Sequence, residues 1–253
     1  MSSAIEVYNR MQDDIASARI QRQSGDVASP ATGVYEEAEF GSQYILDVHY
    51  NVVLCDLRWA HANVLHFFAD TEEAGILRSY NVHADRFLTG DKWVGAYGPI
   101  AMRQIRLCIE KLQKSIHSRR AIVSMGETVE HDTINSPACW SNLHFLYQRE
   151  KLHLHVYQRS LSMSVMPYDA VLLTNILKYV SWNLLVQVGQ VHWTIGSLHR
   201  KVGAIGYATG PMRTALISPY ILRSSQSCMQ ILMDPSATHD AELRAALTVP
   251  QRV

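Results

Sequence analysis

Cys139 carries the side chain best suited to nucleophilic chemistry in this chain. A cysteine attacks as the thiolate, so a nucleophilic cysteine needs nearby cations that favour loss of its proton near neutral pH. The alternative is that Cys139 is a small buried apolar residue, as most free cysteines are. The other cysteines, Cys55, Cys108 and Cys228, are far apart, and no Cys-x-x-Cys or Cys/His pattern predicts a metal site.

Arginines are the candidates for binding an anion. The 23 basic and 23 acidic residues cancel, so bulk charge gives no reason to expect nucleic-acid or membrane binding. Any anion site must therefore come from a few placed arginines, whose planar fork can bind a phosphate through two hydrogen bonds. Arg22, Arg119, Arg120 and Arg159 are the candidates. For Arg119 and Arg120, a solvated turn is the alternative.

Five short segments occur in a fixed order: SRR at 118–120, PAC at 137–139, YQRS at 157–160, PYD at 167–169 and GSLH at 196–199. They resemble the signature blocks SRR, PCH, YQRS, PFN and GDAH of the thymidylate synthase family, which follow one another in the same order. Upstream, Asp70-Thr71, Asn81-Val82 and Ala96-Tyr97-Gly98 also fit, so the similarity covers about residues 70–201. Between YQRS and PYD the chain is one residue shorter, and we place the gap within 161–166.

The resemblance implies a reaction at carbon 5 of a pyrimidine nucleotide. Addition of the Cys139 thiolate to carbon 6 makes carbon 5 nucleophilic enough to accept a one-carbon unit, which in this family comes from 5,10-methylenetetrahydrofolate. Arg159 is expected to favour the thiolate. Tyr97 matches the family's tyrosine that helps remove the proton from carbon 5.

The resemblance also implies how the nucleotide phosphate is held. Arg159 and Ser160 contact it from one subunit, whereas the paired arginines of the SRR segment come from the partner subunit. Arg119 and Arg120 therefore predict a homodimer, which the family forms through its sheet. Arg22, at the edge of the Gly/Ser/Pro-rich stretch 24–33, is a further expected phosphate ligand.

Asp169 is the residue most informative about the base. Uracil-specific members of the family carry asparagine here, whereas the deoxycytidylate hydroxymethylases carry aspartate. Cytosine presents an acceptor at N3 and a donor amino group at C4, which a protonated carboxyl matches, and a carboxylate can pair with a protonated cytosine. Ser197 and His199, in the GSLH segment, also match the hydroxymethylases, and His199 is expected at the sugar. An alternative or additional role for Asp169 is to cap the helix expected after Pro167.

Three positions depart from the family pattern. Asn63 stands where the family has a glutamate that organises water and shuttles protons, and an amide cannot exchange a proton at neutral pH. His61 or His66 could take over, or could simply be packed. Trp140 replaces the histidine after the nucleophile. Lys201 replaces the tyrosine at the sugar hydroxyl, which leaves ribonucleotides and deoxyribonucleotides both open.

The nature of the product depends on the wall of the site. Residues 81–87 are polar and lack the tryptophan with which the synthase shields the exocyclic methylene. Water can then add to give hydroxymethyl, whereas hydride transfer gives methyl. The leading hypothesis is a CMP or dCMP 5-hydroxymethyltransferase. The alternatives are a thymidylate synthase acting on dUMP, a nucleotide-binding paralogue without turnover, and a non-folate alkylation of the same carbon.

Helices and strands must position these residues. The patterns predict helices over 1–20, 57–68 and from Pro167 to about Val186, and strands over 43–53, 121–125, 143–147, 152–157 and 190–195, the last closed by Gly196. In 152–157, the leucines and valine fall on one face, and His153, His155 and Tyr157 fall on the other. We expect one α+β domain over 1–253 with the thymidylate-synthase-like fold, a mixed sheet backed by a long buried helix.

Nothing in the sequence predicts a membrane protein or a secreted one. The first residues, MSSAIEVYNRMQDD, carry acids and have no apolar core, so they do not form a signal peptide. The most apolar stretch, 170–188, is interrupted by Asn175, Lys178, Asn183 and Gln187, which suits a buried helix. We expect a cytoplasmic protein with free thiols.

Overall fold

The computed structural model describes residues 4–18, 20–23, 35–48, 57–79, 88–93, 96–125 and 139–202. The helices are α1 (Ala4–Ala18), α2 (Leu57–Phe68), α3 (Gly75–Ser79), α4 (Gly98–Lys114) and α5 (Met166–Asn183). The strands are β1 (Ile20–Gln23), β2 (Tyr35–Asp47), β3 (Leu88–Thr89), β4 (Lys92–Trp93), β5 (Ile122–Ser124), β6 (Trp140–Gln148), β7 (Lys151–Ser162) and β8 (Gln187–Val202). The fold is therefore α+β, as the sequence predicts.

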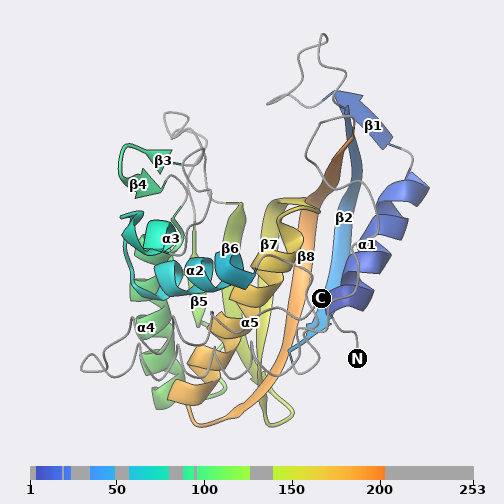
Figure 1. The fold of residues 1–253 in the computed structure, drawn as a ribbon. Coiled ribbons are helices and arrows are strands. Elements are labelled where there is room, and N and C mark those ends of the chain that lie inside the picture. Colours follow the sequence, from blue (N-terminus) through green and yellow to red (C-terminus); the bar gives the residue numbers. More distant parts are fainter. Residues whose placement is uncertain are drawn as a thin grey trace, which may run out of the picture.

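A six-stranded sheet in the order β1-β2-β8-β7-β6-β5 forms the centre of the molecule (Figure 1). The neighbouring strands are antiparallel except β7 and β8, which are parallel, so the sheet is mixed. Helix α5 connects this parallel pair, because parallel neighbours need a crossover connection. Strands β6 and β7 form a hairpin whose turn residues, Arg149 and Glu150, have positive φ angles of 50° and 62°.

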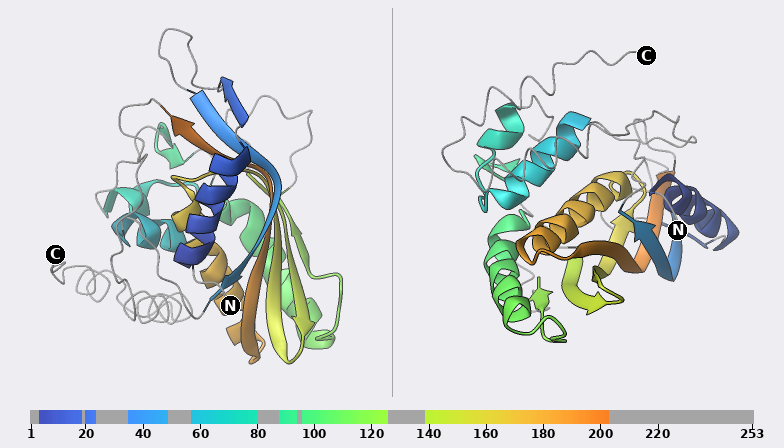
Figure 2. Two further views of the ribbon diagram at one scale, coloured as in Figure 1. Left: turned by 90° about the vertical axis from the view of Figure 1, so that its right-hand side faces the viewer. Right: turned by 90° about the horizontal axis from the view of Figure 1, so that it is seen from below.

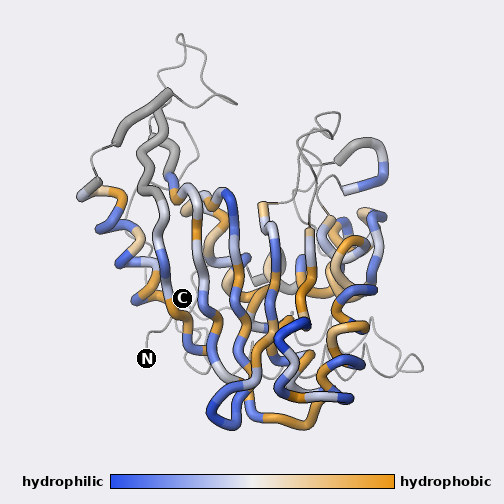
Figure 3. The backbone as a smooth tube through the Cα atoms, turned by 180° about the vertical axis from the view of Figure 1, so that it is seen from behind, coloured by the Kyte–Doolittle hydropathy of each residue, from blue (hydrophilic) through white to orange (hydrophobic). Residues whose placement is uncertain are grey.

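The helices cover one face of this sheet. Helix α5 lies against β7 and β8, α1 against β2 and α4 against β5, and α2 packs on α5 (Figures 1 and 2). No helix of the described part of the chain covers the opposite face, which is seen in front in Figure 3. We call this second surface the open face.

The core lies between the sheet and α5. Leu152, Leu154 and Val156 of β7 point into it and are at most 3% exposed, which confirms the alternation predicted for this strand. Helix α5 is buried along most of its length, from Met166 to Ser181. None of the helices described here is long and apolar enough to cross a membrane.

The expected elements at 57–68, 121–125, 143–147 and 152–157 are confirmed, with β6 and β7 longer than predicted. Helix α1 also agrees with the prediction, and its buried side chains include Tyr8, Met11 and Ile15. Strand β2 begins at Tyr35 rather than at residue 43, and Val48 already lies in a turn, while 49–56 lie outside the described residues. Helix α4 was not predicted.

Gly196 does not close β8, contrary to the prediction, because the strand continues to Val202 between β2 and β7. The glycine serves a close approach instead. A Cβ at this position would lie 2.9 Å from the carbonyl oxygen of Arg159 on β7. A side chain would therefore push β8 away from the strand that carries Arg159.

Candidate active site

Cys139 lies directly before β6 and is half-buried. The backbone N–H of Arg159 donates a hydrogen bond to the Cys139 carbonyl oxygen over 2.8 Å. The next pair along the hairpin is Trp140 opposite Gln158, and an irregularity in the pairing follows between Trp140 and Asn142. The hairpin thus brings together the expected nucleophile and the arginine of the YQRS segment.

Tyr97, the residue that precedes α4, also contacts Cys139. Its hydroxyl accepts a hydrogen bond of 3.2 Å from the backbone N–H of Cys139. The Tyr97 ring also packs on Trp140, with the ring centres 4.5 Å apart. Gly98 makes this position possible, because a Cβ there would meet the carbonyl oxygen of Phe67 in α2.

Burial raises the pKa of the Cys139 thiol above its ordinary value. The Arg159 guanidinium and a hydrogen bond from the Tyr97 hydroxyl lower this pKa, whereas the nearby Asp169 carboxylate raises it. Burial also raises the pKa of Tyr97 well above its ordinary range, with further contributions from Asp169 and Cys139. Arg159 therefore acts in the expected direction, but within one protomer it does not outweigh burial.

Asp169 lies in the first turn of α5 and is only 5% exposed. The side-chain amide of Gln158 donates a hydrogen bond of 3.0 Å to its carboxyl, and another of 2.9 Å to the carbonyl oxygen of Ser160. The indole N–H of Trp193 in turn donates to the Gln158 side-chain oxygen over 3.0 Å. Two strands and one helix thus hold the Asp169 carboxyl in one orientation.

This environment brings the pKa of Asp169 to about 7 from an ordinary 3.8, because burial disfavours the carboxylate. The amide of Gln158 and, less strongly, the indole of Trp140 oppose the shift, although the Trp140 N–H makes no well-aligned hydrogen bond. The prediction that Asp169 caps α5 is not confirmed. The N-cap position is Val165, and no side chain caps there.

The YQRS and GSLH segments run side by side on β7 and β8. Ser160 pairs with Ser197, and Ser162 pairs with His199. The backbone N–H of Met163, in the turn between β7 and α5, donates to the carbonyl oxygen of His199. This turn, 163–165, falls within the range where we place the missing residue.

A model of the thymidylate synthase family matches residues 56–200, which is more than half of the chain. The chain belongs to the thymidylate synthase family. It is also similar to a thymidylate synthase of Staphylococcus haemolyticus (strain JCSC1435), with 28% identity over 97 residues. That match covers 38% of this chain and 30% of the relative, so the chain matches less than a third of that relative's length.

The structure does not gather all the residues that the family pattern singles out. Arg119 and Arg120 are exposed ahead of β5, where the Arg119 carbonyl oxygen is 3.1 Å from the His144 ring nitrogen Nε2. His144 follows Trp140 by four residues of β6, which is about 13 Å along an extended strand. Within one protomer the paired arginines therefore lie away from Cys139.

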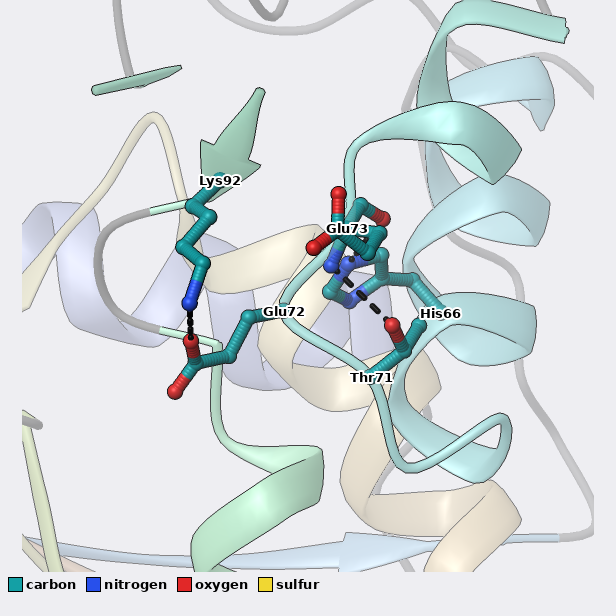
Figure 4. Close-up of polar contacts among 5 residues, drawn as sticks. All are labelled: His66, Thr71, Glu72, Glu73 and Lys92. Carbon is teal, nitrogen blue, oxygen red and sulfur yellow. Dashed lines mark hydrogen bonds and ion pairs between the residues drawn. The ribbon is translucent and has the colours of Figure 1, made fainter. Parts of the chain in front are cut away.

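Asn63 lies on α2 and is half-buried. The side chain of His61 lies outside the described residues. His66 is 2% exposed, and its Nε2 lies 3.1 Å from the Glu73 carbonyl oxygen (Figure 4). Its ring also packs on Trp93, and burial lowers its pKa. The structure therefore favours the packed interpretation of His66.

Other parts of the expected site fall outside the described residues. These parts are the side chains of Arg22 and Lys201 and the whole of residues 80–87. The backbones of Arg22 and Lys201 both pair with Glu36 on β2. Within the described ranges, no group of three or more His, Cys, Asp and Glu side chains could hold a metal ion.

Gln158 and Trp193 belong to this cluster but were not among the predicted site residues. The alternation of β7 gave a usable signal, because Gln158 continues the inward series of Leu152, Leu154 and Val156. An amide at an inward position is buried and needs hydrogen-bond partners. Its partners are Asp169 and Trp193, and together the three residues make up a buried polar network.

Proposed function

We propose that this protein is a pyrimidine nucleotide C5 hydroxymethyltransferase that acts on CMP or dCMP. The one-carbon donor proposed is 5,10-methylenetetrahydrofolate, and the nucleophile proposed is Cys139. The observation that carries the choice of base is the buried Asp169 carboxyl near Cys139, with its pKa at about 7. A large fraction of this carboxyl is protonated near neutral pH.

A protonated carboxyl has one donor and one acceptor, and cytosine needs both. Its O–H can donate to N3 of the base, and its second oxygen can accept from the C4 amino group. Gln158 donates to one carboxyl oxygen, Oδ2, over 3.0 Å, and so fixes the plane of the group. Uracil presents a donor at N3 and an acceptor at C4, so it would need the carboxyl proton on the other oxygen, Oδ2, which already accepts from Gln158. Because the group is buried, such a mismatch is costly.

The covalent steps conserve atoms as follows. The Cys139 sulfur adds to carbon 6, and carbon 5 then forms a bond to the one-carbon unit that the folate supplies. Loss of the carbon 5 proton to water held by the Tyr97 hydroxyl beside Cys139, which stays protonated, together with cleavage of the bond between the one-carbon unit and the folate nitrogen, would release tetrahydrofolate and leave an exocyclic methylene on the pyrimidine. Water adds to that methylene, and elimination of the thiol restores the base. The described residues account for the nucleotide end of this reaction, and none of them is assigned to the folate.

We further propose that the active form is a homodimer. Arg119 and Arg120 are exposed and about 13 Å or more from Trp140 along β6, so they do not serve the Cys139 of their own subunit. In a dimer they would contact the phosphate in the partner's site, together with that site's Arg159 and Ser160. Cations there would also lower the pKa of the thiol, which burial raises in the single protomer.

A second candidate is a thymidylate synthase that methylates dUMP. The matched relative from Staphylococcus haemolyticus carries that name, which favours this alternative. The two candidates differ in what adds to the exocyclic methylene: a hydride from the folate or water. Methylation oxidises the folate to dihydrofolate, whereas hydroxymethylation takes up water and makes none.

The test is to incubate the protein separately with CMP, dCMP and dUMP and with methylenetetrahydrofolate that carries a labelled methylene. We expect label in CMP or dCMP as hydroxymethyl, with no dihydrofolate and no incorporation by Cys139→Ala. Label found only in dUMP, as methyl, would show that the choice of base from Asp169 is wrong.

A third possibility is a nucleotide-binding paralogue without turnover, which the amide at Asn63 and the raised pKa of Cys139 favour. Release of tritium from carbon 5 of labelled nucleotide, without folate, separates this case from both enzymes. Tritium release requires that the Cys139 adduct forms, whereas simple binding releases none.

A further inference from the structure

Three histidines form a row across the open face of the sheet. His144 of β6 pairs with His155 of β7, and His155 pairs with His192 of β8. The row ends on an isoleucine on each side, since Ile122 of β5 pairs with His144 and Ile45 of β2 pairs with His192. We call His144, His155 and His192, together with the adjacent His153, the histidine row.

The rings in the histidine row contact one another directly. His155 and His192 are stacked, with ring centres 4.4 Å apart and planes 6° apart. His192 Nε2 lies 3.4 Å from His153 Nδ1, which also accepts a hydrogen bond of 3.2 Å from the Gln190 backbone N–H. His153 Nδ1 therefore carries no proton, and His192 Nε2 must be the donor. A proton on His153 Nδ1 would break both bonds.

The surroundings of the histidine row do not offset a positive charge. Burial, then His192 and His144, lower the pKa of His155 to about 4, and burial also lowers the pKa values of His153 and His192. Among the described residues, the charged or titratable groups near the row are Arg10 of α1, Asp47 of β2, Arg119 and Arg120 ahead of β5, Arg149, Glu150, Lys151, Tyr157 and Arg159 of the hairpin, and the row itself. The acids nearby are Asp47, which is buried, and Glu150, which lies between Arg149 and Lys151 in the turn.

The open face is suited to burial against a protein. Ile45, Ile122 and Tyr157 are exposed by 47%, 48% and 42%, and all three belong to this face. His155, His192 and Ile45 also line a hollow of about 560 Å³. Large apolar side chains around neutral imidazoles can be covered by a second protein at a lower electrostatic cost than charged side chains.

The histidine row is also linked to the paired arginines. His144 Nε2 lies 3.1 Å from the Arg119 carbonyl oxygen. The segment that carries Arg119 and Arg120 therefore contacts one end of the row. A surface that includes the row therefore also includes the backbone of these arginines. This continuity favours a second copy of the chain as the protein that covers the open face.

We propose that the histidine row makes the association of two copies through the open face sensitive to acid, and that its protonation separates them. This inference rests on the homodimer of the proposed function. In a twofold dimer both copies contribute the same row to one interface. A positive charge on one row is therefore repelled by protonated histidines of the other row as well as by those of its own. Separation would then withdraw Arg119 and Arg120 from the partner's site.

The sign follows from proton linkage. A histidine whose pKa falls when the interface forms binds its proton more readily in the separated copy, so separation takes up protons. In the separated copy these pKa values already lie below 6.5, and that of His155 is about 4, so the dissociation constant should rise as the pH falls from below 6.5 towards about 4. For each proton taken up, the constant rises by up to about tenfold per pH unit.

The experiment is sedimentation velocity of the full chain from pH 8 to pH 4, with wild type, the double variant His155→Gln/His192→Gln and the matched control His117→Gln. His117 is an exposed histidine that lies outside the row, against Tyr147. We expect wild type and H117Q to be dimers at pH 8 and to dissociate at least about tenfold more readily at pH 4. The double variant, which keeps only His144 and His153 of the row, should show a clearly smaller change between the two pH values.

A second variant keeps the test independent of histidine packing. Ile45→Lys places a fixed charge opposite His192 at a half-exposed position, so the fold should tolerate it, and it should be a monomer even at pH 8. Acid-insensitive dimers of the wild type, or a double variant with the same acid dependence as the wild type, would overturn the inference. A wild type that is monomeric throughout would overturn it together with the proposed homodimer, whereas tritium release from carbon 5 tests the Cys139 chemistry separately.

Discussion

Replacing Asp169 by asparagine should change both the pH dependence of stability and the choice of base. The pKa of Asp169 rises from 3.8 to about 7 on burial, and one pKa unit corresponds to about 1.4 kcal/mol. The folded protein holds this proton more tightly than the unfolded chain does. Folding stability is therefore lost as the pH rises from about 4 to about 7, by about 4 kcal/mol in total. The amide of the Asp169→Asn variant has no such titration.

The difference should be clearest between pH 5 and pH 8. Over that range the wild type should lose about 3 kcal/mol from this group, since only the part of the range below pH 7 contributes. Asp169→Asn should therefore gain about 3 kcal/mol relative to wild type between the two pH values. Urea denaturation at each pH measures this difference in the free energy of unfolding. In the same variant, the ratio of kcat/KM for dUMP to that for the cytosine nucleotide should rise by at least about 100-fold, because the amide can match uracil.

The control for this prediction is Asp91→Asn. Asp91 is an exposed carboxylate paired with Arg78 at the surface, and its loss should change stability by less than about 1 kcal/mol at either pH. A difference between D169N and wild type that is the same at pH 5 and pH 8 would refute the raised pKa. A D169N variant that keeps the nucleotide preference of the wild type would refute the role of Asp169 in choosing the base.

Three further substitutions test other parts of the site. Cys139→Ala should abolish tritium release from carbon 5, with a loss of at least about 10⁴-fold, while nucleotide binding by calorimetry persists. Gln158→Leu should lower the free energy of unfolding by about 1–3 kcal/mol, because it removes the partner of the buried Asp169 carboxyl. Gly98→Ala should destabilise the protein by at least about 1–3 kcal/mol, measured by urea denaturation, because its Cβ would overlap the Phe67 carbonyl oxygen.

Each of these has an outcome that contradicts it. Residual tritium release by C139A would mean that another group attacks carbon 6. Unchanged stability of Q158L would mean that the Asp169 carboxyl finds another partner. A stable G98A would mean that α2 and α4 can move apart, and then the Tyr97 contact with Cys139 should weaken in the same variant.

Local patterns were enough to predict the hairpin that carries the site. The alternation of Leu152, Leu154 and Val156 against His153 and His155 set the faces of β7, and the structure confirms them. Regular pairing outwards from the turn brings Arg159 to the neighbourhood of Cys139, but places it opposite Trp140. The irregularity between Trp140 and Asn142 shifts the register by one residue and gives the observed contact, and the sequence did not predict it.

Contacts between distant segments were harder to predict. Helix α4 has an apolar stripe that includes Ala101, Met102, Ile105, Cys108 and Leu112, which is helical spacing. That spacing could have revealed the helix, but nothing in it says that Tyr97 meets Cys139, since this depends on how α4 packs against α2. The raised pKa of Asp169 likewise comes from burial by separate elements, and no single segment contains it.

The turn of the β6–β7 hairpin has a use in protein engineering. Arg149 and Glu150 both adopt left-handed backbone conformations, which cost a residue with a Cβ about 1 kcal/mol or more each and which Asn-Gly adopts readily. The turn lies at the end of the hairpin remote from Cys139. A more stable turn sequence there would give a reinforced background in which damaging substitutions at Gln158 or Gly98 still yield folded protein for assay.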